Sequence, residues 1–274
     1  MTLPADTSAA HARPAVAPRV ALITGAARRI GRALALGFAT QGWDVAVHYG
    51  TSRTEADEVV AEIVALGRRA VALQADLALE AEVARLVPDC TAALGRPVCI
   101  VNNASLFEED TAKDVGYELL LKTTAINLGA PLVLARMLFE ATPEAAHSDE
   151  TQRSVVVNVL DQKLYNMNPD FLSYTLSKAA LQAATVALAQ ALAPKVRIVG
   201  LAPGLTLQSA GQTPEGFVAA HRVAPLGRAS LPEDIVRAAL YLADASGVTG
   251  TTLVVDGGQH LVPSPRDVMF LLGA

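Results

Sequence analysis

The chain is poor in cysteine, in aromatic residues and in positive charge. Its 274 residues include two cysteines, Cys90 and Cys99, and aromatic residues make up 4%. Two cysteines are too few for a disulfide framework, and without a histidine cluster they do not indicate a zinc site. We expect both to be small buried side chains in a reducing compartment. The formal net charge of −5 argues against a general nucleic-acid binder and against binding to anionic membranes.

Long apolar runs and a secretory signal are also missing. No apolar run reaches the roughly 18 residues that a membrane-spanning helix needs. Residues 1–18 are rich in alanine and proline but lack the continuous apolar core of a signal peptide. We therefore predict a cytoplasmic protein with a disordered lead-in at residues 1–18. Residues 19–274, including the C-terminal tail, are predicted to form a single domain, because no linker or repeat divides them.

Short apolar runs alternate with helix-like segments after Pro18. Strands are predicted at Val20–Thr24, Val45–Tyr49, Ala70–Gln74, Val98–Asn102, Val155–Leu160, Arg197–Leu201 and Thr252–Val255. Helices are predicted between them, for example at Ile30–Gln41, Glu55–Leu66, Glu80–Leu94 and Ser173–Leu192. Continuously apolar strands are typical of a parallel sheet covered on both faces. The pattern predicts an α/β fold: a Rossmann-type, doubly wound, parallel seven-stranded sheet with helices on both faces.

The first strand runs into a glycine-containing turn, Thr24–Gly31, at the start of a helix. Such a turn can hold a phosphate with backbone N–H groups and the helix dipole. Gly25 permits the tight turn and Gly31 permits close helix packing. Arg29 stands where a middle glycine would let the backbone approach a pyrophosphate. An ordinary turn with a solvated arginine is the alternative interpretation.

The end of the second strand indicates which dinucleotide would bind. An NAD-selective site has Asp or Glu there to hold the ribose 2′-hydroxyl. This chain has His48, Tyr49, Ser52 and Arg53 instead, and these side chains could hold a 2′-phosphate. We therefore predict NADP rather than NAD, although Arg53 could also simply face water.

Tyr174 and Lys178 lie four residues apart at the start of a predicted helix, so they share a face. We expect the Lys178 charge to lower the pKa of the Tyr174 phenol and so to favour acid–base chemistry. Hydride transfer needs such a proton donor. A bare Tyr-x-x-x-Lys is common by chance, but this one follows a predicted buried strand.

With these motifs, residues 19–260 resemble the short-chain dehydrogenase/reductase family. The resemblance rests on the Thr24–Gly31 turn, Asn102–Ser105, Asn127, the Tyr174/Lys178 pair, Pro203-Gly204 and Asp256–Gly258. It implies that Tyr174 is the acid–base residue and that Lys178 binds the nicotinamide ribose. It also implies that Asn127, in a fifth helix, holds a water linked to Lys178. Asn103 would support the cofactor, and Asp76 would lie near the adenine.

One position departs from the family pattern. The family usually has a serine thirteen residues before the tyrosine, and this chain has Asp161 there. A carboxylate opposes a developing alkoxide, which disfavours ketone reduction. A proton-carrying Asp161 suits reduction of a C=N bond in a nitrogen heterocycle. Alternatively, Asp161 caps a turn or marks lost activity.

Together these features resemble the pteridine reductase branch, which includes dihydrofolate and dihydromonapterin reductases. The branch implies NADPH as cofactor, a pterin or folate as substrate, a homotetramer, and Phe107 stacked on the pterin. Catalytic candidates are Asp161, Tyr174, Lys178 and Asn127. Substrate-binding candidates are Arg29, Ser105, Phe107, Asp161 and Tyr174. Cofactor-binding candidates are Gly25, Arg28, Arg29, Ile30, Gly31, His48, Tyr49, Ser52, Arg53, Asp76, Leu77, Asn103, Ala104, Ser105, Tyr174, Lys178, Pro203, Gly204 and Thr206. No metal is expected.

Two other functions remain open: a carbonyl or 3-oxoacyl reductase of the same family, and an NADPH-binding protein without catalysis. The stretch Ala202–Pro232 is expected to be a long loop with a short helix, and Leu207–Arg228 to cover the substrate. His221 and Arg222 are candidates for discriminating between substrate tails. The apolar run Val268–Leu272 is expected to be buried. It could pack against a second subunit, where the tail would complete a neighbouring site, or against its own subunit.

Overall fold

A single parallel sheet organises the protein. The structure is a computed structural model that describes residues 19–208, 213–228 and 230–271, so the lead-in predicted for residues 1–18 lies outside it. Seven parallel strands of the described chain pair in the order β3-β2-β1-β4-β5-β6-β7. They are β1 (Val20–Ile23), β2 (Asp44–Tyr49), β3 (Ala70–Gln74), β4 (Cys99–Asn102), β5 (Ser154–Val159), β6 (Val196–Pro203) and β7 (Thr252–Val255). The predicted fold class is confirmed.

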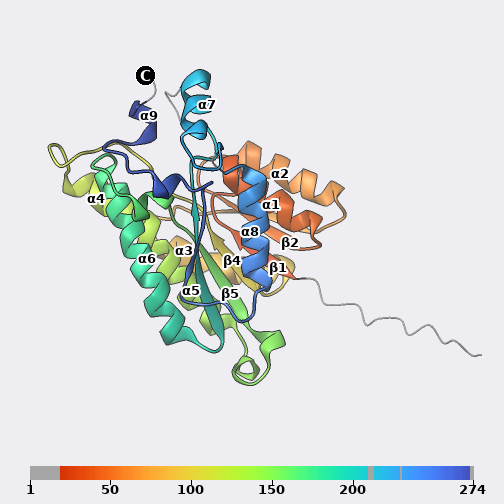
Figure 1. Cartoon of the computed structure of the whole chain (residues 1–274). Coiled ribbons are helices and arrows are strands. Elements are labelled where there is room, and N and C mark those ends of the chain that lie inside the picture. The colour runs from red at the N-terminus through yellow and green to blue at the C-terminus, as the bar shows by residue number, and fades with distance from the viewer. Residues whose placement is uncertain (1–18, 209–212, 229, 272–274) are drawn as a thin grey trace, which may run out of the picture.

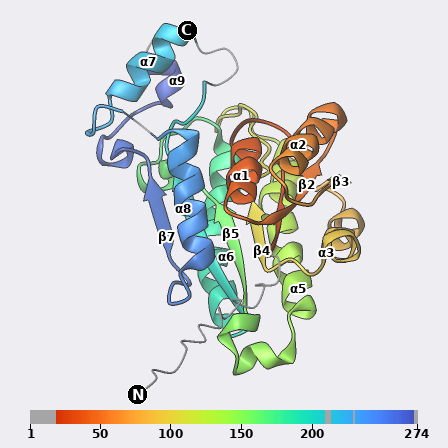
Figure 2. The same cartoon turned by 90° about the vertical axis from the view of Figure 1, so that its right-hand side faces the viewer.

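Helices cover both faces of the sheet (Figures 1 and 2). On one face lie α1 (Arg29–Thr40), α2 (Arg53–Ala65) and α8 (Pro232–Asp244); on the other lie α3 (Glu80–Leu94), α5 (Ala130–Ala141) and α6 (Leu172–Leu192). Three helices begin one or two residues before their predicted starts, namely α1, α2 and α6. Differences of this size are usual at helix ends, where hydrogen bonding rather than the apolar pattern sets the boundary.

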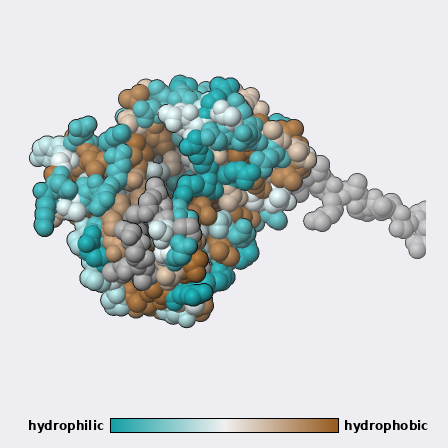
Figure 3. Space-filling model, turned by 90° about the horizontal axis from the view of Figure 1, so that it is seen from above, coloured by the Kyte–Doolittle hydropathy of each residue, from teal (hydrophilic) through white to brown (hydrophobic). Residues whose placement is uncertain are grey.

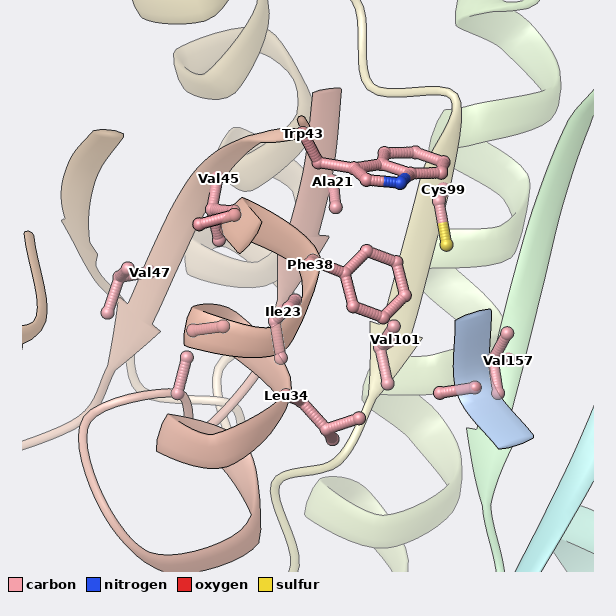
Figure 4. Close-up of a cluster of buried hydrophobic side chains, with 14 of the residues drawn as sticks. Ala21, Ile23, Leu34, Phe38, Trp43, Val45, Val47, Cys99, Val101 and Val157 are labelled. Atoms are coloured by element: carbon pink, nitrogen blue, oxygen red, sulfur yellow. The ribbon is translucent and has the colours of Figure 1, made fainter. Parts of the chain in front are cut away.

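Each face has its own apolar core. On the α1 face, Leu34 and Phe38 join Ile23 of β1 and Val101 of β4 in one buried cluster (Figure 4). Phe38 also meets Trp43 edge to face, with ring centroids 5.2 Å apart. Burying side chains of this size stabilises the fold by about 1.5–3 kcal/mol each. These two cores hold the strand ends, and thus the loops after them, in fixed positions.

A continuous helical segment runs from α4 (Tyr117–Thr124) through a π-helical turn, η1 (Ala125–Gly129), into α5. Its length and composition alone would allow it to cross a membrane. However, Leu134 and Leu138 of α5 are fully buried in the second core, which is the behaviour of a core helix in a globular protein. The π turn contains Asn127, and single π turns inside α-helices are frequent at functional sites.

Short segments gather over the carboxyl ends of the strands. These are α7 (Pro214–Arg222), α9 (Val268–Leu271) and the 3-10 turns η4 (Gln162–Tyr165) and η5 (Gln259–Leu261) (Figure 2). The short helix predicted within Ala202–Pro232 is therefore present as α7. The 3-10 turns η2 (Glu144–His147) and η3 (Glu150–Gln152) lie in the polar stretch before β5. Between β1 and β4 the strand order reverses, and α/β proteins bind ligands outside such a point.

Candidate active site

His48 fixes the turn after β1 through a hydrogen bond to its backbone. The Gly25 N–H donates to His48 Nδ1 at 3.0 Å, and Nε2 of the same ring lies 3.1 Å from the Ala75 carbonyl oxygen. Burial lowers the pKa of His48 to about 4. The ring is therefore neutral, with Nε2–H donating to Ala75. The prediction that His48 holds a 2′-phosphate is wrong, because both ring nitrogens are engaged beneath the turn.

Two glycines are required by close contacts. Gly25 has φ +61°, a left-handed conformation that disfavours other residues. At Gly31, an added Cβ would lie 2.0 Å from the Gly25 carbonyl oxygen and 2.6 Å from Asn103 Nδ2. That amide donates to the carbonyls of Thr24 at 2.9 Å and Gly25 at 3.3 Å. The loops after β1 and β4 are thus locked together at the point where the strand order reverses.

Arg29 occupies the middle position of the turn in a glycine-like conformation. Its φ is +53°, which accounts for the usual preference for glycine there and places the side chain over the site. The guanidinium donates to the Gln208 carbonyl at 3.0 Å and also approaches that of Leu207. No side chain caps α1, and its first turn contains no acidic residue. The positive end of this helix is therefore suited to a phosphate.

Two arginines lie exposed near the end of β2. Arg28 pairs with Glu55, and Arg53 pairs with Asp57 at 3.0 Å. Tyr49 is buried, with its ring 6.0 Å from the Arg53 guanidinium carbon, while Ser52 precedes α2. Farther along the sheet edge, Asp76 is exposed and accepts the Ala78 N–H, and Leu77 is buried. Each arginine has a carboxylate partner that a 2′-phosphate would have to share or displace.

Tyr174 and Asp161 are joined directly. The Tyr174 hydroxyl donates to Asp161 Oδ2 at 2.7 Å, while Asp161 Oδ1 accepts the Lys163 N–H at 2.8 Å. Burial raises the pKa of Asp161 above its ordinary value. Burial and the Asp161 charge raise the pKa of Tyr174 well above its ordinary value. The pair is therefore arranged to carry protons rather than to be ionised at both groups.

Lys178 does not have the predicted effect on Tyr174. Its Nζ donates to the Val159 carbonyl at 2.7 Å and lies 5.8 Å from the centroid of the Tyr174 ring. The expectation that Lys178 lowers the pKa of Tyr174 is wrong, because burial and the neighbouring carboxylate dominate in the opposite direction. Burial lowers the pKa of Lys178 itself to about 8.

Asn127 ties the site together from the π turn. Its Oδ1 accepts the Leu106 N–H at 2.8 Å, and its Nδ2 donates to the Leu106 carbonyl and the Ser177 hydroxyl, both at 3.0 Å. Asn127 thus fixes the loop that carries Ser105 and Phe107 to α6, which carries Tyr174. The predicted water link between Asn127 and Lys178 stays a prediction.

A cavity of about 270 Å³ lies beside Asp161, the hydrogen-bond partner of Tyr174. Its lining includes Phe107, Asp161, Arg29 and Leu207. The Phe107 ring stacks on Phe171 at 4.1 Å and meets Tyr174 edge-on at 4.7 Å. Phe107 is 43% exposed, so part of its ring is open to the cavity. Figure 3 shows this end of the molecule from above, where hydrophilic and hydrophobic side chains are mixed.

Of the remaining predicted residues, Gly204 and Thr206 line the cavity. Ser105 and Ala104 follow β4, and Ser105 is exposed. Pro203 ends β6, and Gly204, with no room for a Cβ beside Asp256, lines the cavity. The Thr206 hydroxyl is buried and bonded to the Gly204 carbonyl and to Ser230. The predicted role of Thr206 in cofactor binding stays a prediction.

The tail packs on its own subunit and supplies residues that sequence reasoning missed. Val262, Ser264, Asp267 and Val268 line the cavity. Phe270 stacks on Phe171 with ring centroids 5.8 Å apart, so three phenylalanines form a ladder that ends at Phe107. The apolar run in the tail indicated burial but not its target. His221 and Arg222 are not among the cavity-lining residues; His221 packs against Phe217 instead.

Known proteins are similar to this chain in sequence and in fold. A family model described as enoyl-(acyl carrier protein) reductase matches residues 25–260. The crystal structure of FolM alternative dihydrofolate reductase 1 from Brucella canis, complexed with NADP, is 40% identical, with a TM-score of 0.85, over 92% of this chain and 98% of that one. An uncharacterized oxidoreductase of Mycobacterium tuberculosis is 35% identical over 88% of this chain and 91% of its own length. A 3-oxoacyl-[acyl-carrier-protein] reductase of Synechocystis is 31% identical over 89% and 98%.

The fold, together with Tyr174 and Lys178 one turn apart on α6, defines a dinucleotide-dependent oxidoreductase. The chain belongs to the short-chain dehydrogenase/reductase family. Within that family it is similar to the Brucella protein over nearly its whole described length.

Proposed function

We propose that the protein reduces the ring of a pterin with NADPH. The observation that carries the proposal is the hydrogen bond from Tyr174 to Asp161 at the wall of a cavity lined by Phe107. A carboxyl group at this position opposes an alkoxide but can pass a proton to a ring nitrogen. An aromatic ring beside it suits a flat heterocycle. The substrate class includes dihydropteridines, dihydrofolate and dihydromonapterin, and the 40% identity to a FolM dihydrofolate reductase supports it.

NADP is the cofactor. The glycine turn and the uncapped start of α1 fit a pyrophosphate, which Gly25, Arg29, Ile30 and Gly31 would hold. Arg53 begins α2 directly after β2, and Arg28 pairs with Glu55 of the same helix, so these two arginines would bind the 2′-phosphate. Asn103, Ala104 and Lys178 would hold the nicotinamide half. When bound, the cofactor supplies the hydride, and the NADP complex of the Brucella relative supports this assignment.

The proton route follows from the groups around Tyr174. A bare phenolate next to an ionised Asp161 is unfavourable, since burial and that charge both raise the pKa of Tyr174. When Asp161 carries a proton, the hydrogen bond between the two groups runs from Asp161 to the Tyr174 oxygen. Tyr174 then gives its own proton to N8 of an oxidised pterin as Asp161 passes its proton to Tyr174. One hydride at C7 and one proton at N8 reduce the C7=N8 bond, and Asp161 is left as a carboxylate. For a dihydropterin the reduced bond is C6=N5, and water supplies the proton at N5.

Two other functions are less favoured. The first is a carbonyl or 3-oxoacyl reductase. One 3-oxoacyl-[acyl-carrier-protein] reductase is 31% identical to this chain, but in such a reaction Asp161 would face the developing alkoxide. A non-catalytic NADPH-binding protein has no need for a buried Tyr174 bonded to Asp161 with Lys178 one helical turn away. A homotetramer and a cytoplasmic location also remain part of the proposal.

The position of hydride transfer tests the proposal. NADPH deuterated at the transferred position is incubated with an oxidised pterin and, separately, with a dihydropterin. Nuclear magnetic resonance of the products should find deuterium at C7 in the first case and at C6 in the second. Cofactor oxidation without deuterium in the pterin ring would overturn the proposal.

A further inference from the structure

The C-terminal segment, residues 262–270, brings a second carboxylate to the cavity that Asp161 lines. Asp267 belongs to this segment and lines the same cavity. Its side chain is 20% exposed. Two carboxyl groups beside one small cavity repel each other when both are charged. Their arrangement therefore affects whether Asp161 keeps a proton.

Asp170 fixes the position of Asp267. The Asp267 N–H donates to Asp170 Oδ2 at 2.7 Å, and Arg266 Nε lies 2.8 Å from both Asp170 oxygens. Asp170 is itself buried. Three residues after Asp267, the stacking of Phe270 on Phe171 adds an apolar contact. The segment is thus held against the residues that immediately precede α6 and Tyr174.

Lys163 joins the two carboxyl groups. Its backbone N–H donates to Asp161 Oδ1, and its buried ammonium lies 3.4 Å from Asp267 Oδ2. The same ammonium donates to the Asp170 carbonyl at 2.6 Å. The charge of Lys163 acts on Asp161 and favours its ionised form. A carboxylate paired with that cation offsets this effect.

We propose that Asp267 is a positioning residue for proton delivery: held beside Lys163 by the C-terminal segment, its carboxylate offsets the charge of Lys163 and so keeps a proton on Asp161. The inference rests on the proposed function, in which Asp161 passes that proton through Tyr174. Asp267 acts through Asp161 and needs no contact with the substrate.

The charged and titratable groups facing Asp161 come from three elements. Lys163 lies in η4, Tyr174 and Lys178 lie in α6, and Asp267 lies in the C-terminal segment. Burial has the largest effect on Asp161 and raises its pKa. The hydrogen bonds from the Tyr174 hydroxyl and the Lys163 N–H lower that pKa. The charge of Asp267 raises it, and the charge of Lys163 lowers it. Across the cavity, Arg29 is the lining cation among the described residues. The two partners of one ion pair therefore act on Asp161 in opposite directions.

This opposition gives a sharp test with three variants. Asp267→Asn should move the pH at which pterin turnover falls to a lower value, and Lys163→Met should move it to a higher value, each on the order of one pH unit. Arg136→Gln is the control, because it removes an exposed arginine whose partners, Glu80 and Glu140, are not among the groups that act on Asp161. It should leave the midpoint in place, whatever it does to the rate.

Infrared difference spectroscopy supplies a second readout that needs no turnover. The carboxylic acid C=O band that disappears in Asp161→Asn reports the protonation of Asp161. Deprotonation of Lys178 does not contribute to this band. Its midpoint should shift downward in Asp267→Asn and upward in Lys163→Met. Shifts in the same direction, or no shift, would overturn the inference and leave only a structural role for the ion pair. Absence of pterin turnover in the unmodified protein would instead defeat the proposed function, and the infrared midpoints would still decide the inference.

Discussion

Tyr174 donates its hydroxyl hydrogen to Asp161 Oδ2 across 2.7 Å, although Lys178 lies one helical turn away on the same helix. The bond couples the phenol to a carboxyl group whose pKa burial raises. The acid–base unit of this site is consequently a tyrosine–carboxyl pair, and Lys178 is bound to the Val159 carbonyl beside it.

Asp161→Asn should reduce pterin turnover by about 100-fold or more, since the amide still accepts a bond from Tyr174 but has no acidic proton to pass on. Steady-state NADPH oxidation measures the loss. Asp149→Asn, which changes a half-buried acid directly before η3, is the matched control. The dissociation constant of NADPH should be similar in both variants, and unchanged turnover in Asp161→Asn would contradict the proton route.

Phe107→Leu should raise the KM for a pterin about 5-fold, because a stacked aromatic contact is worth about 1 kcal/mol beyond its burial. The kcat should change less. Tyr117→Leu removes an aromatic ring that is 82% exposed on α4 and serves as the control. An equal rise in KM in both variants would mean that Phe107 does not contact the substrate.

Arg53→Asp should weaken NADPH binding at least about 10-fold and NADH binding much less, because a carboxylate would repel the 2′-phosphate. Fluorescence titration with both nucleotides gives the ratio. Arg85→Asp changes an exposed arginine on α3 that has its own carboxylate partner, and should leave the ratio unchanged. If Arg53→Asp leaves the ratio intact while Arg28→Asp alters it, Arg28 holds the phosphate.

His48 should make the protein less stable as the pH falls from about 6.5 towards 4. Its folded pKa of about 4 lies below the ordinary value of 6.5. The unfolded chain therefore takes up the proton first, and the stability present above pH 6.5 is lost across that window. The total is about 3 kcal/mol. The free energy of unfolding of the protein and of His48→Gln, measured by chemical unfolding at several pH values, isolates the contribution of His48. Parallel pH dependences would contradict the neutral, buried ring.

Much of the fold could be predicted from the sequence because the signals are local. The buried strands β1 and β5 are continuously apolar or nearly so, and the glycine turn stands directly after β1. Asp161 and Tyr174 were also recognisable, since their spacing of thirteen residues is a local pattern. The single domain over residues 19–274, the tetramer and the cytoplasmic location stay predictions.

Other parts of the site depend on contacts between distant residues. Lys163 meets Asp267 across 104 residues of sequence, and Arg266 meets Asp170 across 96. No local pattern indicates either pair. The pKa of Tyr174 was misjudged for a related reason: the sequence places Lys178 nearby but does not show that its ammonium is bound to Val159. Similarly, His48 was expected to face the cofactor, but β2 is buried along its whole length.

Substrate turnover tests the central claim most directly. NADPH oxidation is followed with dihydrobiopterin, dihydrofolate, dihydromonapterin and an oxidised pterin, with a 3-oxoacyl thioester and a simple quinone as controls. Asp161, Tyr174 and Phe107 around one cavity predict turnover of the pterins and little or none of the controls. Turnover of the controls alone would contradict the account, because it would mean that Asp161 serves a carbonyl site.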